Sequence, residues 1–453
     1  MKWTNFIVRW AIILLLAGNC SGTFAQDAST TRAQHIYELF VAGQGDSIHA
    51  ALNKELQGQL APTFFNDSFR QMEGMFGKLK SQGDWKTESA QGITLYYSDL
   101  EFERYHLRFL LSFDADGSLN TIRLMPVPEA TVAQPVAYDK SKMEERDVTV
   151  GADGYKLPGT LTLPRSAVDA GARRVPCVIL VHGSGPNDRD ETVGPNKPFR
   201  DLAWGLAERG IAVLRYDKRT KVYGANCVPE GRELDYDTEA ADDAVAIVEQ
   251  VKAFPEIAAD SIFVVGHSLG GTLAPRIAAR SKDLAGIISL AGLARPLEDA
   301  MSEQFTYISS LTDSSADSQA RLDELKQQLA NAKNLGTGAF DEKIPVPMGQ
   351  PRSYWLFANT YKPVEVAATL KLPILVLQGE RDYQVTMEDF GLWRAGLLHR
   401  KNAFFKSYPK LNHLFQEGSG KATPFEYNEA SPIPAYVMDD IASFVKGSPA
   451  RLY

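Results

Sequence analysis

One short segment of the chain has the residue types and spacing of a reactive serine. Gly266-His267-Ser268-Leu269-Gly270 follows an apolar run at 261–265 and opens a helical pattern at Leu269–Arg280. The G-x-S-x-G pattern between a strand and a helix is typical of a nucleophilic serine, because flanking glycines permit a turn that raises the hydroxyl above the sheet. The alternative is a glycine-rich turn with an incidental serine. The strand–helix context favours acyl transfer through Ser268.

A serine hydroxyl needs a base to take its proton, and the base needs a carboxylate to orient it. Two stretches downstream of the serine supply candidates. The apolar run 373–378 precedes Gly379-Glu380-Arg381-Asp382, and the run 403–407 precedes Leu411-Asn412-His413. Glu380 and His399 are the alternative acid and base. His399 falls at the end of a helical pattern and would point away from the sheet.

With these motifs, residues from about 147 to 450 resemble the α/β-hydrolase superfamily. The resemblance is closest to secreted or periplasmic esterase-like members related to dienelactone hydrolases and prolyl-oligopeptidase-type peptidases. It implies the chain order serine, acid, histidine, and a G-x-x-D pattern that assigns the acid to Asp382 and the base to His413. It also implies a serine hydrolase that cleaves carboxylic esters. The alternative activity is that of a serine peptidase acting on short peptides or acyl-amino acids.

The oxyanion of such a reaction needs two backbone donors. The N–H of Leu269, directly after the serine, is the first candidate. The second is the N–H of Ser184, in the loop His182-Gly183-Ser184-Gly185-Pro186, which resembles the H-G-x oxyanion loop of the family. His182 itself is expected to hold this loop through a hydrogen bond rather than to touch substrate.

Two charged segments lie close to these motifs. Asn187-Asp188-Arg189-Asp190 could suggest a metal site, but an ion-paired loop is favoured because the arginine supplies the counter-charge. Asp217-Lys218-Arg219 could line a pocket rim or be solvated, and the sequence does not separate the two. The proposed chemistry requires no metal and no organic cofactor.

Strand-like and helical patterns alternate from residue 147 onward, which predicts an α/β domain over 147–453 with a mostly parallel, doubly wound sheet. An antiparallel hairpin at 147–150 and 155–163 is expected at one edge. The buried strands are expected at 177–181, 211–215, 261–265, 286–290, 374–377 and 403–407. The helices are expected at 200–209, 238–251, 269–280, 387–398 and 436–445.

A long interruption at about 293–372 is expected to form a helical lid over the active site, because excursions of this length within compact domains are usually functional. It includes an amphipathic helix with Leu322, Leu325 and Leu329 on one side, ending near Gly336. Its aromatic side chains could line an acyl pocket or pack the lid against the main domain; they are Phe305, Tyr307, Tyr354, Trp355, Phe357 and Tyr361.

Residues 27–130 have the pattern of a small α+β domain, followed by a proline-containing linker at 131–146. Helices are expected at 31–42 and from about 61–62, the second with Phe64, Phe65, Phe69 and Met72. A three-stranded antiparallel meander is expected at 90–98, 105–113 and 119–124. The histidines of this domain, at 35, 49 and 106, are too scattered to predict a metal site.

The first 25 residues have the features of a secretory signal peptide. Lys2 and Arg9 precede the apolar run 11–17, and Thr23-Phe24-Ala25 offers small residues for cleavage. A membrane anchor is the alternative, but the apolar segment is short for a bilayer span. We therefore expect an exported protein, periplasmic or extracellular, with no stable membrane span.

The composition limits the kinds of partner that the protein could bind. The chain has 453 residues and a formal net charge of -8, without a basic run that could follow a phosphate backbone, so no nucleic-acid partner is expected. The partner is a small ester or short acyl or peptide substrate, and the oligomeric state is not indicated. Cys177 and Cys227 are expected at opposite ends of the sheet and hence as free thiols. A binding protein on a decayed hydrolase scaffold is the non-enzymatic alternative.

Overall fold

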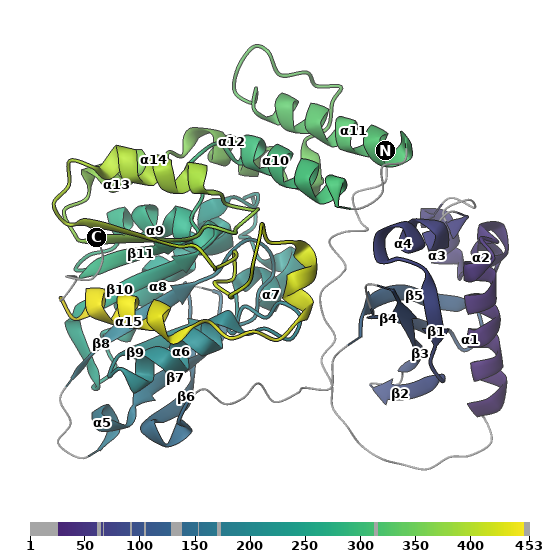
Figure 1. Cartoon of the computed structure of the whole chain (residues 1–453), viewed down its shortest axis with the longest axis horizontal. Helices are drawn as coiled ribbons and strands as arrows, with labels where there is room; N and C mark the ends of the chain where they lie inside the picture. The colour runs from purple at the N-terminus through teal and green to yellow at the C-terminus, as the bar shows by residue number, and fades with distance from the viewer. Residues whose placement is uncertain are drawn as a thin grey trace. The chain divides into compact units, whose positions relative to one another are not determined.

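The computed structural model describes residues 26–60, 65–66, 68–90, 93–103, 106–127, 138–152, 154–169, 174–311 and 316–447 (Figure 1). The predicted signal peptide and the start of the second predicted helix lie outside these residues. The chain divides into two compact units. The small unit comprises 1–131 with 309–319, and the large unit comprises 132–308 with 320–453.

The small unit contains four helices and a five-stranded antiparallel sheet among its described residues. The helices are α1 (Gln26–Val41), α2 (Gly45–Ala51), α3 (Lys54–Gln59) and α4 (Ser68–Phe76). The strands are β1 (Leu79–Gln82), β2 (Lys86–Ala90), β3 (Ile93–Phe102), β4 (His106–Phe113) and β5 (Leu119–Pro126). The order is β1-β3-β4-β5, with β2 also paired to β3.

The core of the small unit is aromatic. Phe40, on α1, packs its ring 5.2 Å from that of Phe109 on β4 and 6.0 Å from that of Phe69 on α4. The predicted meander is present, but β1 and β2 were missed because their sequences, LKSQ and KTESA, lack apolar alternation. The second predicted helix corresponds to α4, which begins at Ser68 and carries Phe69 and Met72. Helix α3 precedes it and was not predicted; the side chain of Asn53 caps α3 by accepting a hydrogen bond from the Leu56 N–H.

The large unit is built on an eight-stranded sheet in the order β13-β12-β11-β10-β8-β9-β7-β6. The bounds are β6 (Met143–Val150), β7 (Leu157–Pro164), β8 (Val175–Val181), β9 (Ala212–Tyr216), β10 (Ile257–His267), β11 (Gly286–Leu290), β12 (Ile374–Gly379) and β13 (Ala403–Tyr408). Strands β8 to β13 pair in parallel, whereas β7 pairs antiparallel with both β6 and β9. The predicted parallel sheet with an antiparallel edge hairpin is therefore confirmed.

Strand β6 begins at Met143, inside the segment 131–146 that was expected to be a linker. Its sequence, MEERDVTV, is mostly polar because β6 is an edge strand with alternating exposure. The start of this strand therefore has no apolar run by which it could be predicted from the sequence.

Helices cover both faces of this sheet (Figure 1). One face is covered by α6 (Pro198–Glu208) and α15 (Ala435–Val445), whose apolar residues share a core with Val178, Leu180 and Val265. The other is covered by α8 (Asp242–Val251), α9 (Leu269–Arg280) and α14 (Met387–Leu397). Short helices α5 (Arg165–Val168) and α7 (Arg219–Tyr223) follow β7 and β9. The doubly wound arrangement brings the carboxyl ends of β8, β10, β11, β12 and β13 to one edge of the sheet.

The predicted lid interval contains four α-helices among its described residues: α10 (Leu297–Ser310), α11 (Ala316–Ala332), α12 (Arg352–Thr360) and α13 (Pro363–Thr369). The amphipathic helix is α11, which ends at Ala332 rather than near Gly336. Its Leu329 packs with Trp355 of α12 in a small apolar cluster. The lid thus has a core of its own.

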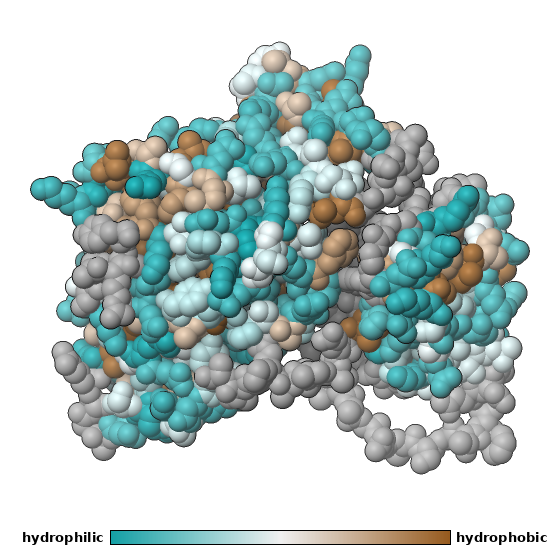
Figure 2. All heavy atoms as spheres, viewed as in Figure 1, coloured by the Kyte–Doolittle hydropathy of each residue, from teal (hydrophilic) through white to brown (hydrophobic). Residues whose placement is uncertain are grey.

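Hydrophilic side chains cover most of the large unit's face seen in Figure 2. No helix among the described residues is long and apolar enough to cross a membrane. Cys177 and Cys227 are both buried free thiols, as predicted. Burial raises the pKa of the Cys177 thiol to about 12, so this thiol stays protonated.

Candidate active site

Ser268 lies on a tight turn between β10 and α9. Its backbone has φ 52° and ψ −115°, in the left-handed half of conformational space that non-glycine residues rarely adopt. A Cβ on Gly266 would lie 2.0 Å from the carbonyl oxygen of Gly270, and one on Gly270 would lie 2.0 Å from that of Val181. Only glycine fits at these positions, which explains the flanking glycines of the motif. The turn is further held by the Ser268 N–H, which donates to the Leu290 carbonyl at 2.9 Å.

The carboxyl ends of β12 and β13 bring Asp382 and His413 together. The Nδ1 of His413 lies 2.6 Å from the Oδ2 of Asp382, and both side chains are buried. The other carboxylate oxygen accepts hydrogen bonds from the backbone N–H groups of Gln384 and Val385, at 2.7 and 3.1 Å. The carboxylate is thereby fixed and acts as acceptor, so Nδ1 carries the hydrogen and Nε2 is left with a lone pair.

The alternative acid and base occupy other positions. The carboxylate of Glu380 accepts a hydrogen bond from the Ser407 hydroxyl, at 2.7 Å. His399 follows α14 on the surface and is exposed. The pairing of Asp382 with His413 therefore matches the assignment made from the resemblance.

His267, which precedes Ser268 in the chain, contacts His413. The His267 ring lies 4.7 Å from the His413 ring, centroid to centroid, and its Nε2 donates to the His413 backbone carbonyl at 2.9 Å. Among the described residues, no hydrogen bond joins the Ser268 hydroxyl to the His413 imidazole. Contacts of this kind are often long in the absence of substrate. Ser268 is half-buried.

The predicted oxyanion loop packs directly against the serine. A Cβ on Gly183 would lie 3.1 Å from the Cβ of Ser268. Ser184 is exposed, and Leu269 is the first residue of α9. The N–H groups in the first turn of a helix have no partner within the helix and carry partial positive charge, which makes the Leu269 N–H a donor suited to an anion.

His182 is packed rather than exposed. Its ring lies 5.0 Å from that of Phe199 and 5.1 Å from that of Tyr216, centroid to centroid. Burial lowers its pKa to about 4, so the ring is neutral at physiological pH. His182 therefore supports the loop mainly through the packing of its ring. The sequence had suggested that it would do so through a hydrogen bond.

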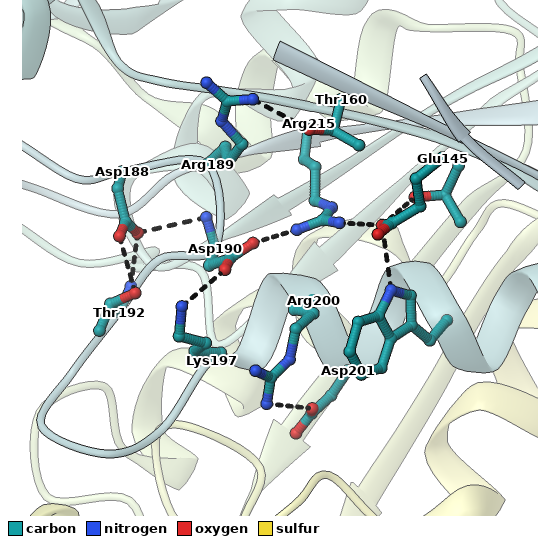
Figure 3. Close-up of polar contacts among 12 residues, drawn as sticks. Glu145, Thr160, Asp188, Arg189, Asp190, Thr192, Lys197, Arg200, Asp201 and Arg215 are labelled. Atoms are coloured by element: carbon teal, nitrogen blue, oxygen red, sulfur yellow. Dashed lines mark hydrogen bonds and ion pairs between the residues drawn. The ribbon is translucent and has the colours of Figure 1, made fainter. Parts of the chain in front are cut away.

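The charged loop after Ser184 is ion-paired, as favoured from the sequence (Figure 3). Asp190 pairs with Lys197, at 3.0 Å, and with Arg215, which also contacts Glu145. Arg189 pairs with Asp217 through two nitrogens, at 2.9 and 3.1 Å. The described residues contain no group of three histidine, cysteine or acidic side chains placed to hold a metal.

Lys218 and Arg219 are buried, so a solvated loop, one of the two possibilities left open for this segment, is wrong for them. Arg219 forms a two-point ion pair with Asp243. The Nζ of Lys218 contacts the carboxylate of Glu239 and donates to the Gly183 carbonyl at 2.8 Å. A buried charge needs a partner, which Glu239 provides for Lys218. The bond to Gly183 then connects this ion pair to the predicted oxyanion loop.

A second buried acid–imidazole pair, which the sequence did not predict, lies beside the first. The Oε2 of Glu191 lies 2.9 Å from the Nδ1 of His267, while its Oε1 accepts a hydrogen bond from the Gly183 N–H at 2.6 Å. One signal was available, because His267 ends a buried strand and an ionisable group there requires a partner. The position of that partner, eight residues after Gly183, carried no sequence signal.

The lid aromatics pack mostly against the main sheet domain. The Tyr361 hydroxyl donates to the Thr272 carbonyl of α9 at 2.9 Å, and the Tyr307 hydroxyl donates to the Ala422 carbonyl at 3.0 Å. Tyr354 also packs into the core of this domain, with its buried hydroxyl beside the side chains of Glu239 and Ser184. Burial raises the pKa of Tyr354 well above its ordinary value, so the hydroxyl keeps its hydrogen.

Two family models match this chain. Residues 178–423 match the alpha/beta hydrolase family, and residues 33–121 match a family described as a protein of unknown function, DUF3887. Esterase EstD of Thermotoga maritima is 32% identical over 406 residues, which cover 88% of this chain and 92% of EstD. The similarity to EstD therefore extends across both units.

Similar solved structures include Est1E from Butyrivibrio proteoclasticus, with 17% identity and a TM-score of 0.43 over 67% of this chain and 99% of Est1E. The acylaminoacyl peptidase of Pyrococcus horikoshii has 14% identity and a TM-score of 0.41, over 82% of this chain and 50% of the peptidase. The family match and the relative EstD decide the assignment. The chain is a hydrolase similar to carboxylesterases and belongs to the α/β-hydrolase family.

Proposed function

We propose that the protein is an exported serine esterase that cleaves carboxylic esters through an acyl-enzyme, with Ser268 as nucleophile, His413 as base and Asp382 as the orienting acid. The observation that supports this most strongly is the buried pair of Asp382 and His413 at the sheet edge where β10 delivers Ser268. The relative EstD is named an esterase, which supports the ester as substrate class.

The reaction begins when Ser268 Oγ attacks the carbonyl carbon while His413 Nε2 takes the hydroxyl proton. The N–H groups of Ser184 and Leu269 stabilise the oxyanion that forms. His413 then gives its proton to the departing alcohol, leaving the acyl group on Ser268. Water attacks this ester by the same route in reverse and releases the acid and the free enzyme. Asp382 keeps the imidazole in the tautomer that both steps need.

A fluorophosphonate probe tests this proposal, because it reacts only with an activated serine. We expect the mature protein to be labelled and the Ser268→Ala variant to be inert. Ser281→Ala is a matched control, because Ser281 is at the opposite end of the same helix and should leave labelling unchanged. Labelling of Ser268→Ala, or none of the wild type, would contradict the proposal.

The leaving group is tested separately with short p-nitrophenyl esters and aminoacyl p-nitroanilides. We expect the esters to be the faster substrates, and a preference for the anilides would identify a peptidase instead. Export is tested by mass spectrometry of the protein recovered from the native cell envelope. Cleavage before Gln26 is expected, whereas an intact N-terminus would contradict export.

A further inference from the structure

The pair formed by Glu191 and His267 connects two loops that the proposed reaction needs. At one end, Glu191 Oε1 accepts from the Gly183 N–H at 2.6 Å, in the oxyanion loop. At the other, His267 Nε2 lies 2.9 Å from the His413 carbonyl, in the loop of the base. The two side chains are 3% and 6% exposed, so water does not replace these contacts.

The geometry assigns the Nε2 hydrogen of the imidazole. A carbonyl only accepts hydrogen bonds, so Nε2 must carry a hydrogen to bond His413. Nδ1 lies 2.9 Å from a carboxylate oxygen, within ion-pair distance although not aligned for a hydrogen bond, and the negative charge favours a hydrogen there as well. Burial opposes the charge on His267, but the adjacent Glu191 carboxylate and the His413 carbonyl raise its pKa above the ordinary value, with a smaller contribution from Asp382.

The segment that carries Glu191 is fixed on both sides. Asp190 is held between Lys197 and Arg215, and Asp188 accepts from the Thr192 N–H and hydroxyl at 2.9 and 2.8 Å (Figure 3). Glu191 itself adopts φ 51°, which is unfavourable for a non-glycine residue. Such a conformation persists only where the surroundings impose it. The loop therefore has a fixed structure that aims this carboxylate inward.

Gly183 is also held at its carbonyl, which accepts a hydrogen bond from Lys218 at 2.8 Å. His182, neutral and buried, is the remaining titratable group that faces Glu191. The charged groups that most affect the pair are thus its own two members and Asp382 of the triad.

We propose that Glu191 and His267 are positioning residues that fix the oxyanion loop relative to the loop of His413 through a buried carboxylate–imidazolium pair. The inference rests on the proposed function, since it assigns a role relative to the base and the oxyanion donors. Neither side chain is required to touch substrate. They act by holding the donors and the base in the geometry that the transition state needs, where an error of about 1 Å can lower the rate about 100-fold.

The test uses the Glu191→Gln variant, which keeps an acceptor for the Gly183 N–H and can donate to His267 Nδ1 but removes the charge. We expect kcat for a p-nitrophenyl ester to fall about 10- to 100-fold, with KM changed less than about threefold. Wild-type activity should decline at alkaline pH as His267 loses its proton. In Glu191→Gln this decline should be absent, because without the carboxylate the buried imidazole is already neutral.

His267→Gln and the double variant complete a cycle. If Glu191 acts through His267, the double variant should lose no more activity than the more impaired single variant. Asp243→Asn is a matched control: it removes the charge from a buried carboxylate paired with Arg219, and it should retain the wild-type pH profile. Melting temperatures identify any variant that fails to fold.

The outcomes separate the two proposals. Hydrolysis that does not depend on Ser268 would defeat the proposed function. An active, Ser268-dependent wild type whose Glu191→Gln variant keeps the same kcat and alkaline decline would overturn this inference and leave the function intact. Losses that multiply in the double variant would also overturn it.

Discussion

Two buried carboxylate–imidazole pairs lie at the same sheet edge, and their difference is instructive. In each, a carboxylate lies within 3 Å of an Nδ1, at 2.6 Å for Asp382 and His413 and 2.9 Å for Glu191 and His267. The imidazoles differ at Nε2. That of His267 is occupied by a backbone carbonyl, whereas no hydrogen bond to Nε2 of His413 is found among the described residues. We infer that His413 can act as a base because its Nε2 is free to take a proton. His267, whose Nε2 is already hydrogen-bonded, can only hold the two loops in position.

The largest effect should come from the pair that includes the base. Asp382→Asn keeps the shape of the acid but favours the wrong imidazole tautomer, and we expect kcat to fall about 10⁴-fold. Steady-state hydrolysis of a p-nitrophenyl ester measures this. A larger loss of kcat in Glu191→Gln than in Asp382→Asn would contradict this comparison, because the pair of Glu191 and His267 would then contribute more to catalysis than the pair that includes the base.

A second prediction concerns the ion pair that holds the other side of Gly183. Lys218→Met keeps the length of the side chain but leaves Glu239 as a buried carboxylate without its cation. We expect the free energy of unfolding to drop by about 3–5 kcal/mol, the usual effect of breaking one partner of a buried pair. Urea denaturation measures it. An unchanged midpoint would show that the loop does not depend on this support.

The smallest effect is the pH dependence of stability from Glu191 and His267. His267 has a raised pKa, so its contribution is complete below the ordinary value of 6.5 and is lost as pH rises through the folded-state pKa. The buried Glu191 has a lowered pKa: burial raises it, but the adjacent His267 and the hydrogen bond from the Gly183 N–H outweigh that effect. Its contribution is complete above 4.5 and is lost as pH falls.

The stability difference between wild type and Glu191→Gln should therefore be greatest between about pH 4.5 and 6.5 and shrink on either side. Unfolding free energies of the two proteins across this range measure it. A difference that is independent of pH would show that the pair is not ionised.

The sheet and the pairing of Asp382 with His413 were within reach of the sequence because their signals are local. An apolar run marks each buried strand, and a glycine-flanked serine or a residue just beyond a strand end marks the edge where the side chains meet. Glu191, Lys218 and Glu239 lacked such signals. In the sequence they are ordinary charged residues of polar loops and a helix, and only the folded chain buries them. The start of β6 could not be predicted either, because an exposed edge strand needs no apolar run and this one has none.

The bond between Tyr361 and Thr272 has a practical consequence for anyone who redesigns the substrate range. It joins the C-terminal end of α12 to the helix that begins beside the nucleophile. Because α12 also carries Tyr354, beside Ser184, we propose that exchanging individual side chains on this tethered helix changes selectivity more readily than loosening its connections.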